Sequence, residues 1–312
     1  MFARVLQKYA IYFGFLAIFA VFSVLSPHFL QGQNLSNILV QASVMAIIAI
    51  GQTMVIITGG IDLSVGSIVA CTSLVSAVLI VDSGMPVPVG LLIALLISLL
   101  MGFVNGFISH YGRVPPFITT LGIMSIARGA ALALKGGRPV GNVPDAYEGL
   151  ATTTLFGRIP IFILYIVIAY AIAYFFLMYT RHGRYIYAIG GNRDAARLSG
   201  IPVKLYGTLA YVIAGGLAGI GGILLTARLD YASPITGYGY ELDAIASSVI
   251  GGTSLSGGEG NILGTLLGAV MIVTLKNGLT LLDVSAYYQQ ITIGVVVIMA
   301  VFLDSIKSLR AE

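Results

Sequence analysis

The chain has 312 residues, of which 58% are hydrophobic and only 9% are charged. An average soluble domain carries about 25% charged residues, so this composition leaves too little polar surface to coat a water-soluble globule of this size. The formal net charge of +4 is too small and too dispersed for a nucleic-acid-binding protein. The composition therefore predicts an all-α membrane protein and excludes a nucleic-acid partner.

Hydrophobic stretches recur along the whole chain, and a membrane-spanning helix needs about 20 mostly apolar residues. The first stretch, 9–25, follows Arg4 and Lys8 and lacks a small-residue cleavage site, so we interpret it as an uncleaved helix. The other stretches are 39–58, 65–81, 86–108, 117–134, 160–179, 206–227, 242–256, 262–282 and 286–303. They predict a polytopic bundle of about ten crossings, with eight or nine as the alternative, in one transmembrane domain over 1–312.

Glycine-rich segments interrupt this pattern twice, which predicts broken or re-entrant helices at 59–66 and 242–260. Residues 59–66 match 251–258 at six of eight positions when Asp62 and Ser254 are counted as similar. Transporters are often built from repeated halves, with broken helices near the binding site. A repeat here would be parallel, because the predicted topology places both copies on the same side; chance similarity is the alternative.

The distribution of Lys and Arg near the spans predicts the orientation. With both termini in the cytoplasm, the inner segments hold ten of these residues and the outer segments hold four. We therefore expect cytoplasmic termini.

The longest basic inner loop, 181–204, contains signals for a short helix. Asn192 is a good cap for a helix that begins at Arg193, with Asp194 in its first turn, and Gly200 and Pro202 would end it. A low-relief alanine face on that helix would suit a groove on another protein, although a solvated basic loop is the alternative. The residues expected to make this contact are Asn192, Arg193, Asp194, Ala195, Ala196 and Gly200.

Charges within the spans are costly and need partners. We expect Arg128 to pair with an acid such as Asp62, because two lone buried charges would be worse than a pair; alternatively, Arg128 reaches an interface or backbone carbonyls. The residues expected to line the pathway or the helix breaks are Gly59, Gly60, Asp62, Ser64, Asn105, Arg128, Asp243 and Ser247.

The segment 255–259 resembles the signature motif of ABC-type ATPases, but the chain contains no Gly-Lys dipeptide for a phosphate-binding loop. We interpret it as a tight connection between helices. The three histidines fall near span ends, and no His, Cys and carboxylate residues have metal-ligand spacing. We expect no catalytic residue, metal or cofactor in this chain.

Longer motifs carry a resemblance to a known family. Asp194, Ala195, Ala196 and Gly200 resemble the coupling loop of bacterial ABC importer permeases, with Asp in place of the usual Glu. Residues 60–67 and 237–246 resemble the sugar branch of these permeases, and 277–289 is similar to its ribose-transporting members. Lys276 departs from the neutral polar residue expected there, and we expect it to reach the outer interface. The resemblance covers about 25–303.

This resemblance implies a permease subunit in the bacterial inner membrane that moves a monosaccharide, ribose or a similar pentose. It also implies a cytoplasmic ABC ATPase that holds ATP and Mg²⁺, a second permease subunit, either a copy or a relative, and a periplasmic sugar-binding protein. An ion-coupled secondary transporter of a small polar solute is the alternative, with Asp62 and Asp243 as its candidate ion ligands. A membrane enzyme would need a catalytic constellation that the sequence lacks.

Overall fold

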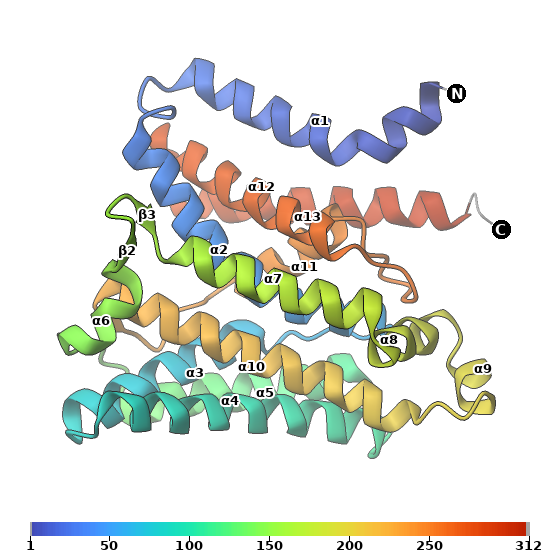
Figure 1. Cartoon of the computed structure of the whole chain (residues 1–312), viewed down its shortest axis with the longest axis horizontal. Coiled ribbons are helices and arrows are strands. Elements are labelled where there is room, and N and C mark those ends of the chain that lie inside the picture. The colour runs from blue at the N-terminus through green and yellow to red at the C-terminus, as the bar shows by residue number, and fades with distance from the viewer. Residues whose placement is uncertain (1, 310–312) are drawn as a thin grey trace.

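The computed structural model describes the backbone of residues 2–309 and the side chains of residues 11–302. The long helices run side by side along the longest axis of the molecule (Figure 1). Helix α6 (Asp145–Thr152) and the hairpin of β2 (Thr154–Leu155) and β3 (Ile159–Pro160) lie at one end, which we call the α6 end. Helices α8 (Arg181–Gly191) and α9 (Arg193–Leu198) lie at the other end, which we call the α9 end (Figure 1). The start of α1 (Phe2–Leu25) and the last turns of α13 (Ala286–Leu309) also lie there (Figure 1).

The elements follow the predicted hydrophobic stretches closely. The helices are α1 (Phe2–Leu25), α2 (Gly32–Ile57), α3 (Val65–Ala77) with the π-helical turn η1 (Val78–Asp82), α4 (Val87–His110), α5 (Pro116–Lys135), α6 (Asp145–Thr152), α7 (Phe162–Tyr179), α8 (Arg181–Gly191), α9 (Arg193–Leu198), α10 (Val203–Leu229), α11 (Tyr240–Ile250), α12 (Ile262–Leu281) and α13 (Ala286–Leu309). Four two-residue strands form two antiparallel pairs, β1 (Val140–Gly141) with β4 (Tyr231–Ala232) and β2 (Thr154–Leu155) with β3 (Ile159–Pro160).

Seven helical segments in the described chain are long and apolar enough to cross a membrane: α2, α3 with η1, α4, α5, α7, α10 and α12. The described apolar parts of α1 and α13, Ile11–Leu25 and Ala286–Phe302, are shorter. Helix α11 has 11 residues and is roughly 16 Å long, about half of the hydrocarbon thickness. The structure confirms a polytopic all-α bundle in which the eighth predicted span is a half-length helix.

The helices differ in what they contact. Helices α2, α3 and α10 are mostly buried within the chain, whereas α4, α5 and α7 leave most of their surface exposed. That exposed surface is apolar and includes Leu100, Ile126 and Ile172, each at least 59% exposed. Apolar side chains of this size have a favourable solvent in lipid but not in water, so these three helices form part of the lipid-facing wall.

Close glycine contacts hold α10 against α4. A Cβ added to Gly102 would lie 2.3 Å from the carbonyl oxygen of Tyr211, and one added to Gly215 would lie 2.6 Å from that of Ser98. A Cβ added to Gly268 on α12 would likewise lie 2.1 Å from the carbonyl oxygen of Ser247 on α11. Glycines on facing helices therefore let the backbones pack directly against each other within this chain.

The two glycine-rich breaks meet at the α9 end. The first break, 58–64, follows α2, and the second break, 251–261, follows α11. The amide of Gly258 donates to the carbonyl of Ile57 at 2.9 Å, and a Cβ on Gly257 would lie 3.0 Å from the Cα of Gly59. In each case a helix runs toward the α9 end to its break and a second helix runs back toward the α6 end (Figure 1), which is the parallel relation that the sequence predicts.

Candidate functional site

The short helix in the basic loop forms as expected. The side chain of Asn192 accepts a hydrogen bond from the amide of Ala195 at 2.9 Å and caps α9. Gly200, with φ of +80°, ends the helix in a conformation that favours glycine. Asp194 lies in the first turn and forms an exposed ion pair with Arg197 at 3.4 Å.

The alanine face of α9 differs from the prediction. Ala195 is exposed, but Ala196 is buried against Ile189 of α8 and Val203 and Tyr206 of α10. Ala196 therefore anchors α9 to its own chain and is not available to a partner, because α8 and α10 cover that side of the helix. Leu198, which is 85% exposed, adds an apolar side chain to the outward face that the sequence analysis did not identify.

A basic cavity of about 510 Å³ lies between α9 and the connection of α4 to α5. Its lining includes four cationic side chains, Arg113, Arg193, Arg197 and Lys204. Ser109 and His110, at the end of α4, also line it. The guanidinium of Arg193 donates to Nδ1 of His110 at 3.0 Å, so the first residue of α9 is tied to the last residue of α4. Sequence reasoning noted His110 only as a histidine near a span end.

Polar side chains gather at the first break. Oδ1 of Asp62 accepts hydrogen bonds from the amide and hydroxyl of Ser64 at 2.8 and 2.6 Å, and the amide of Asn105 on α4 donates to that hydroxyl at 2.7 Å. All three residues are fully buried. The hydroxyl of Thr120 on α5 reaches the carbonyl of Ile61 at 3.4 Å. The structure thus brings together three predicted pathway residues, which we call the Asp62 cluster.

Glycines set the shape of this break. Gly59 has φ of +78°, which permits the turn after α2. Gly60 faces Tyr211 of α10 so closely that a Cβ there would lie 2.3 Å from the tyrosine hydroxyl oxygen. The two glycines therefore let the backbone turn beside α10 and carry Asp62 into the interior.

The expected pairing of Arg128 with Asp62 is wrong. Arg128 donates to the backbone carbonyls of Pro234 and Thr236, at 2.6 and 3.1 Å, in the connection between β4 and α11. Helix α5 carries Arg128 toward the α6 end, whereas Asp62 lies near the α9 end, so the two residues are at different depths. Arg128 therefore satisfies backbone carbonyls, as the alternative stated, and fixes the entry into α11.

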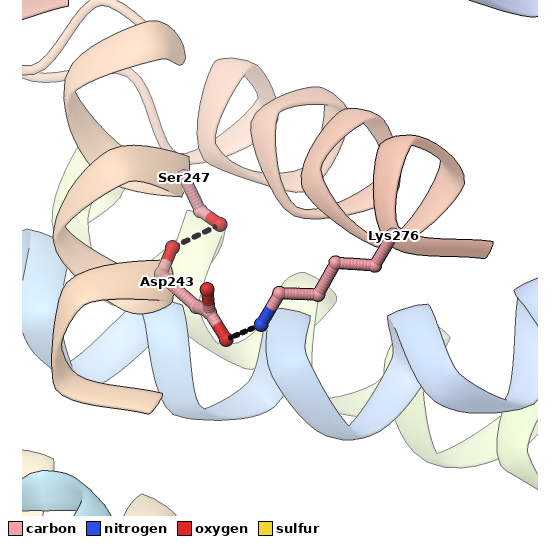
Figure 2. Close-up of polar contacts among 3 residues, drawn as sticks. All are labelled: Asp243, Ser247 and Lys276. Atoms are coloured by element: carbon pink, nitrogen blue, oxygen red, sulfur yellow. Dashed lines mark hydrogen bonds and ion pairs between the residues drawn. The ribbon is translucent and has the colours of Figure 1, made fainter. Parts of the chain in front are cut away.

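Asp243 is paired with a different cation. Figure 2 shows the ammonium group of Lys276, on α12, against the carboxylate of Asp243 on α11. Asp243 is only 1% exposed, and a buried carboxylate needs such a counter-charge. The expectation that Lys276 reaches the outer interface is wrong, because this ion pair takes up its charge. The hydroxyl of Ser247 donates to the backbone carbonyl of Asp243 at 2.7 Å, within α11 (Figure 2).

Within the part of the chain whose side chains are described, no three His, Cys, Asp or Glu residues are grouped so that they could hold a metal ion. The two candidate functional features of the described structure are the capped, exposed helix α9 and the buried polar cluster at the first break.

Comparison with known proteins shows the family to which the chain belongs. Residues 34–301 match the family described as the permease component of branched-chain amino acid transport systems. The match covers most of the chain, which therefore belongs to this family of transport-system permeases.

Individual relatives show which branch of this permease family the chain resembles. The ribose import permease RbsC of Bacillus subtilis (strain 168) is 44% identical over 98% of this chain and 95% of its own length. The ribose import permease RbsC of Escherichia coli (strain K12) is 46% identical over 94% of this chain and 92% of its own, and the D-allose transport system permease AlsC of the same organism is 38% identical over 98% and 94%. No solved structure matches the chain. The chain is thus a ribose-type ABC sugar permease, a multi-pass transporter component of the bacterial inner membrane rather than an enzyme.

Proposed function

We propose that this chain forms the membrane pathway of an ABC importer for ribose, driven by ATP that a separate subunit hydrolyses. The observation that carries this proposal is the likeness, over nearly the full length of both chains, to two ribose import permeases. A capped helix that projects at one end of the bundle and a broken helix next to it are the parts that such a division of labour needs.

The ATPase docks on the outward face of α9, where Asp194, Ala195 and Leu198 are exposed. That subunit holds the ATP and Mg²⁺, and the excess of Lys and Arg in the segments of the α9 end supports a cytoplasmic position for this end and both termini. The periplasmic sugar-binding protein delivers its cargo at the α6 end, and a second permease subunit, a copy of this chain, completes the pathway.

The Asp62 cluster contributes to the sugar route. A neutral sugar presents hydroxyl groups only, so its pathway needs hydrogen-bonding atoms rather than a strong net charge. Oδ2 of Asp62 and Oδ1 of Asn105 are buried acceptors with no hydrogen-bond partner in the described structure. Buried polar atoms are normally paired, and hydroxyls of a passing pentose would pair these two.

The ion-coupled alternative has no support. It relies on Asp62 and Asp243 as cation ligands, but Lys276 already neutralises Asp243. The relatives named above are sugar permeases of ABC systems.

Reconstitution tests the proposal. Proteoliposomes containing this chain, its ATPase and its binding protein should take up radiolabelled ribose when ATP is present on the α9 side. Vesicles without ATP, and vesicles with an ATPase variant that cannot hydrolyse it, are the controls. Uptake by this chain alone, driven by an ion gradient, would refute the proposal, and faster uptake of allose than of ribose would refute the assigned sugar.

A further inference from the structure

Three side chains form a continuous connection between α9 and the first break. Arg193 of α9 donates to Nδ1 of His110 at 3.0 Å. The ring of His110 meets the ring of Tyr211 on α10 edge-on, with the centroids 5.9 Å apart and the planes at 61°. The hydroxyl of Tyr211 lies directly against Gly60, two residues before Asp62.

We propose that Arg193, His110 and Tyr211 transmit the movement of α9 to the first break, so that the docked ATPase controls the Asp62 cluster. This proposal rests on the proposed function, since it needs an ATPase that moves α9. These are positioning residues: they act on the sugar route through the break.

The first link is the hydrogen bond between Arg193 and His110, and its donor and acceptor are defined. A guanidinium can only donate, so Nδ1 of His110 is an acceptor and carries no proton. His110 is 5% exposed, and a Cβ on Gly207 of α10 would lie 2.4 Å from Nε2. The ring is therefore held between the guanidinium and the backbone of α10, so a movement of Arg193 acts directly on it.

The second link, between Tyr211 and the break, is equally tight. Tyr211 is fully buried, and its hydroxyl touches a residue that has no side chain. Packed interiors are not continuously deformable, so a shift of the ring must displace the backbone at Gly60. The glycine is required because any side chain would occupy the position of the hydroxyl.

Two unpaired polar groups at this point allow a second arrangement. The Tyr211 hydroxyl and Oδ2 of Asp62 both lack a hydrogen-bond partner in the described structure. A buried donor and a buried acceptor left unpaired are costly, so a movement that brought the two groups together would add a hydrogen bond between them. A small movement of the break therefore changes which groups Asp62 offers to a sugar.

The coupling ratio, ATP hydrolysed per ribose imported, tests the first link in the reconstituted complex. His110→Leu removes the acceptor and should raise this ratio about tenfold, a typical size for coupling between two sites, while the ATPase still co-purifies. His110→Gln restores an acceptor and should return the ratio to within about threefold of the parent value. His28→Leu is the matched control, because His28 is exposed at the α6 end and its side chain bonds Gln31 alone among the described residues.

The second link is tested by a pair of substitutions that does not depend on His110. Gly60→Ala should abolish ribose uptake because its Cβ overlaps the Tyr211 hydroxyl, and adding Tyr211→Phe should restore part of it because phenylalanine lacks that oxygen. Gly122→Ala is the control, since a Cβ there meets nothing within 4 Å.

The outcomes separate the two proposals. If the parent complex fails to import ribose with ATP, the proposed function is wrong. If the parent imports ribose and His110→Leu keeps the parent coupling ratio, or if Tyr211→Phe does not improve Gly60→Ala, the connection through these side chains is wrong.

Discussion

The two helix breaks share a backbone turn, but only one of them buries a carboxylate. In the first break, Asp62 accepts from the amide of Ser64 at 2.8 Å, and in the second, Ser254 accepts from the amide of Ser256 at 3.3 Å. The same side-chain-to-backbone turn thus occurs at matching positions of the repeat. Only the first break holds a buried carboxylate, and in the described structure that carboxylate forms no ion pair.

The buried acid near the second break, Asp243, has a counter-charge. Asp243 lies at the start of α11, where a negative charge is favourable, and Lys276 neutralises it. The first break thus leaves a buried carboxylate without a counter-charge, whereas the buried acid near the second break is neutralised within the structure. Substitutions at both breaks test this difference.

The largest effect is expected at Lys276. Lys276→Met leaves the buried carboxylate of Asp243 without a counter-charge, which should destabilise the fold by about 3 kcal/mol. Thermal unfolding in detergent measures this loss. The double variant Lys276→Met with Asp243→Asn should recover most of it, and a single variant as stable as the parent would show that the ion pair has no structural role.

At the first break, Asp62→Ala should act on transport rather than on stability alone. The substitution removes both hydrogen bonds to Ser64 and an acceptor of the sugar route, so ATP-dependent ribose uptake should fall at least about tenfold, as for the loss of a hydrogen bond to a charged group. Uptake is compared with the amount of folded protein recovered. Parent-level uptake in this variant would remove Asp62 from the pathway.

A smaller effect is expected at the cap of α9. Asn192→Ala removes the hydrogen bond to the amide of Ala195, which should cost about 1 kcal/mol of local helix stability. Affinity for the ATPase subunit should then fall about fivefold, measured by titration in detergent. Asn192→Ser keeps a capping oxygen and should bind as the parent does; equal binding by the alanine variant would contradict a docking role for an intact α9.

The smallest effect is expected at Ser254. Ser254→Ala removes the hydrogen bond that the amide of Ser256 donates, within a partly exposed turn, and should change stability by about 0.5 kcal/mol or less and ribose uptake by less than twofold. Both assays are run beside Asp62→Ala. A loss of uptake equal to that of Asp62→Ala would abolish the distinction between the two breaks.

Local signals in the sequence predicted local structure correctly. Asn192 and Gly200 mark the ends of α9 because capping and left-handed backbone depend on single residues. The glycine clusters marked both breaks, and hydrophobic stretches marked the long helices. The short, polar stretch 242–256 indicated the half-length α11.

Pairings between distant residues were predicted less well, because they depend on depth along each helix. Arg128 lies 12 residues after Pro116, the first residue of α5, which places it about 18 Å from the α9 end of that helix and out of reach of Asp62. Asp243 and Lys276 meet because α11 and α12 pack side by side, which no local pattern in the sequence indicates. His110 and Tyr211 were missed because a histidine or tyrosine near a span end is common at membrane interfaces.

One glycine of α8 touches both halves of the repeat. A Cβ on Gly190 would lie 1.7 Å from the carbonyl oxygen of Ile57 and 2.4 Å from the amide nitrogen of Gly258. Gly190 is therefore the point at which α8 lies against the exits of α2 and α11 together. Any side chain at this position would displace both breaks at once, so the space between α8 and the two breaks admits only glycine.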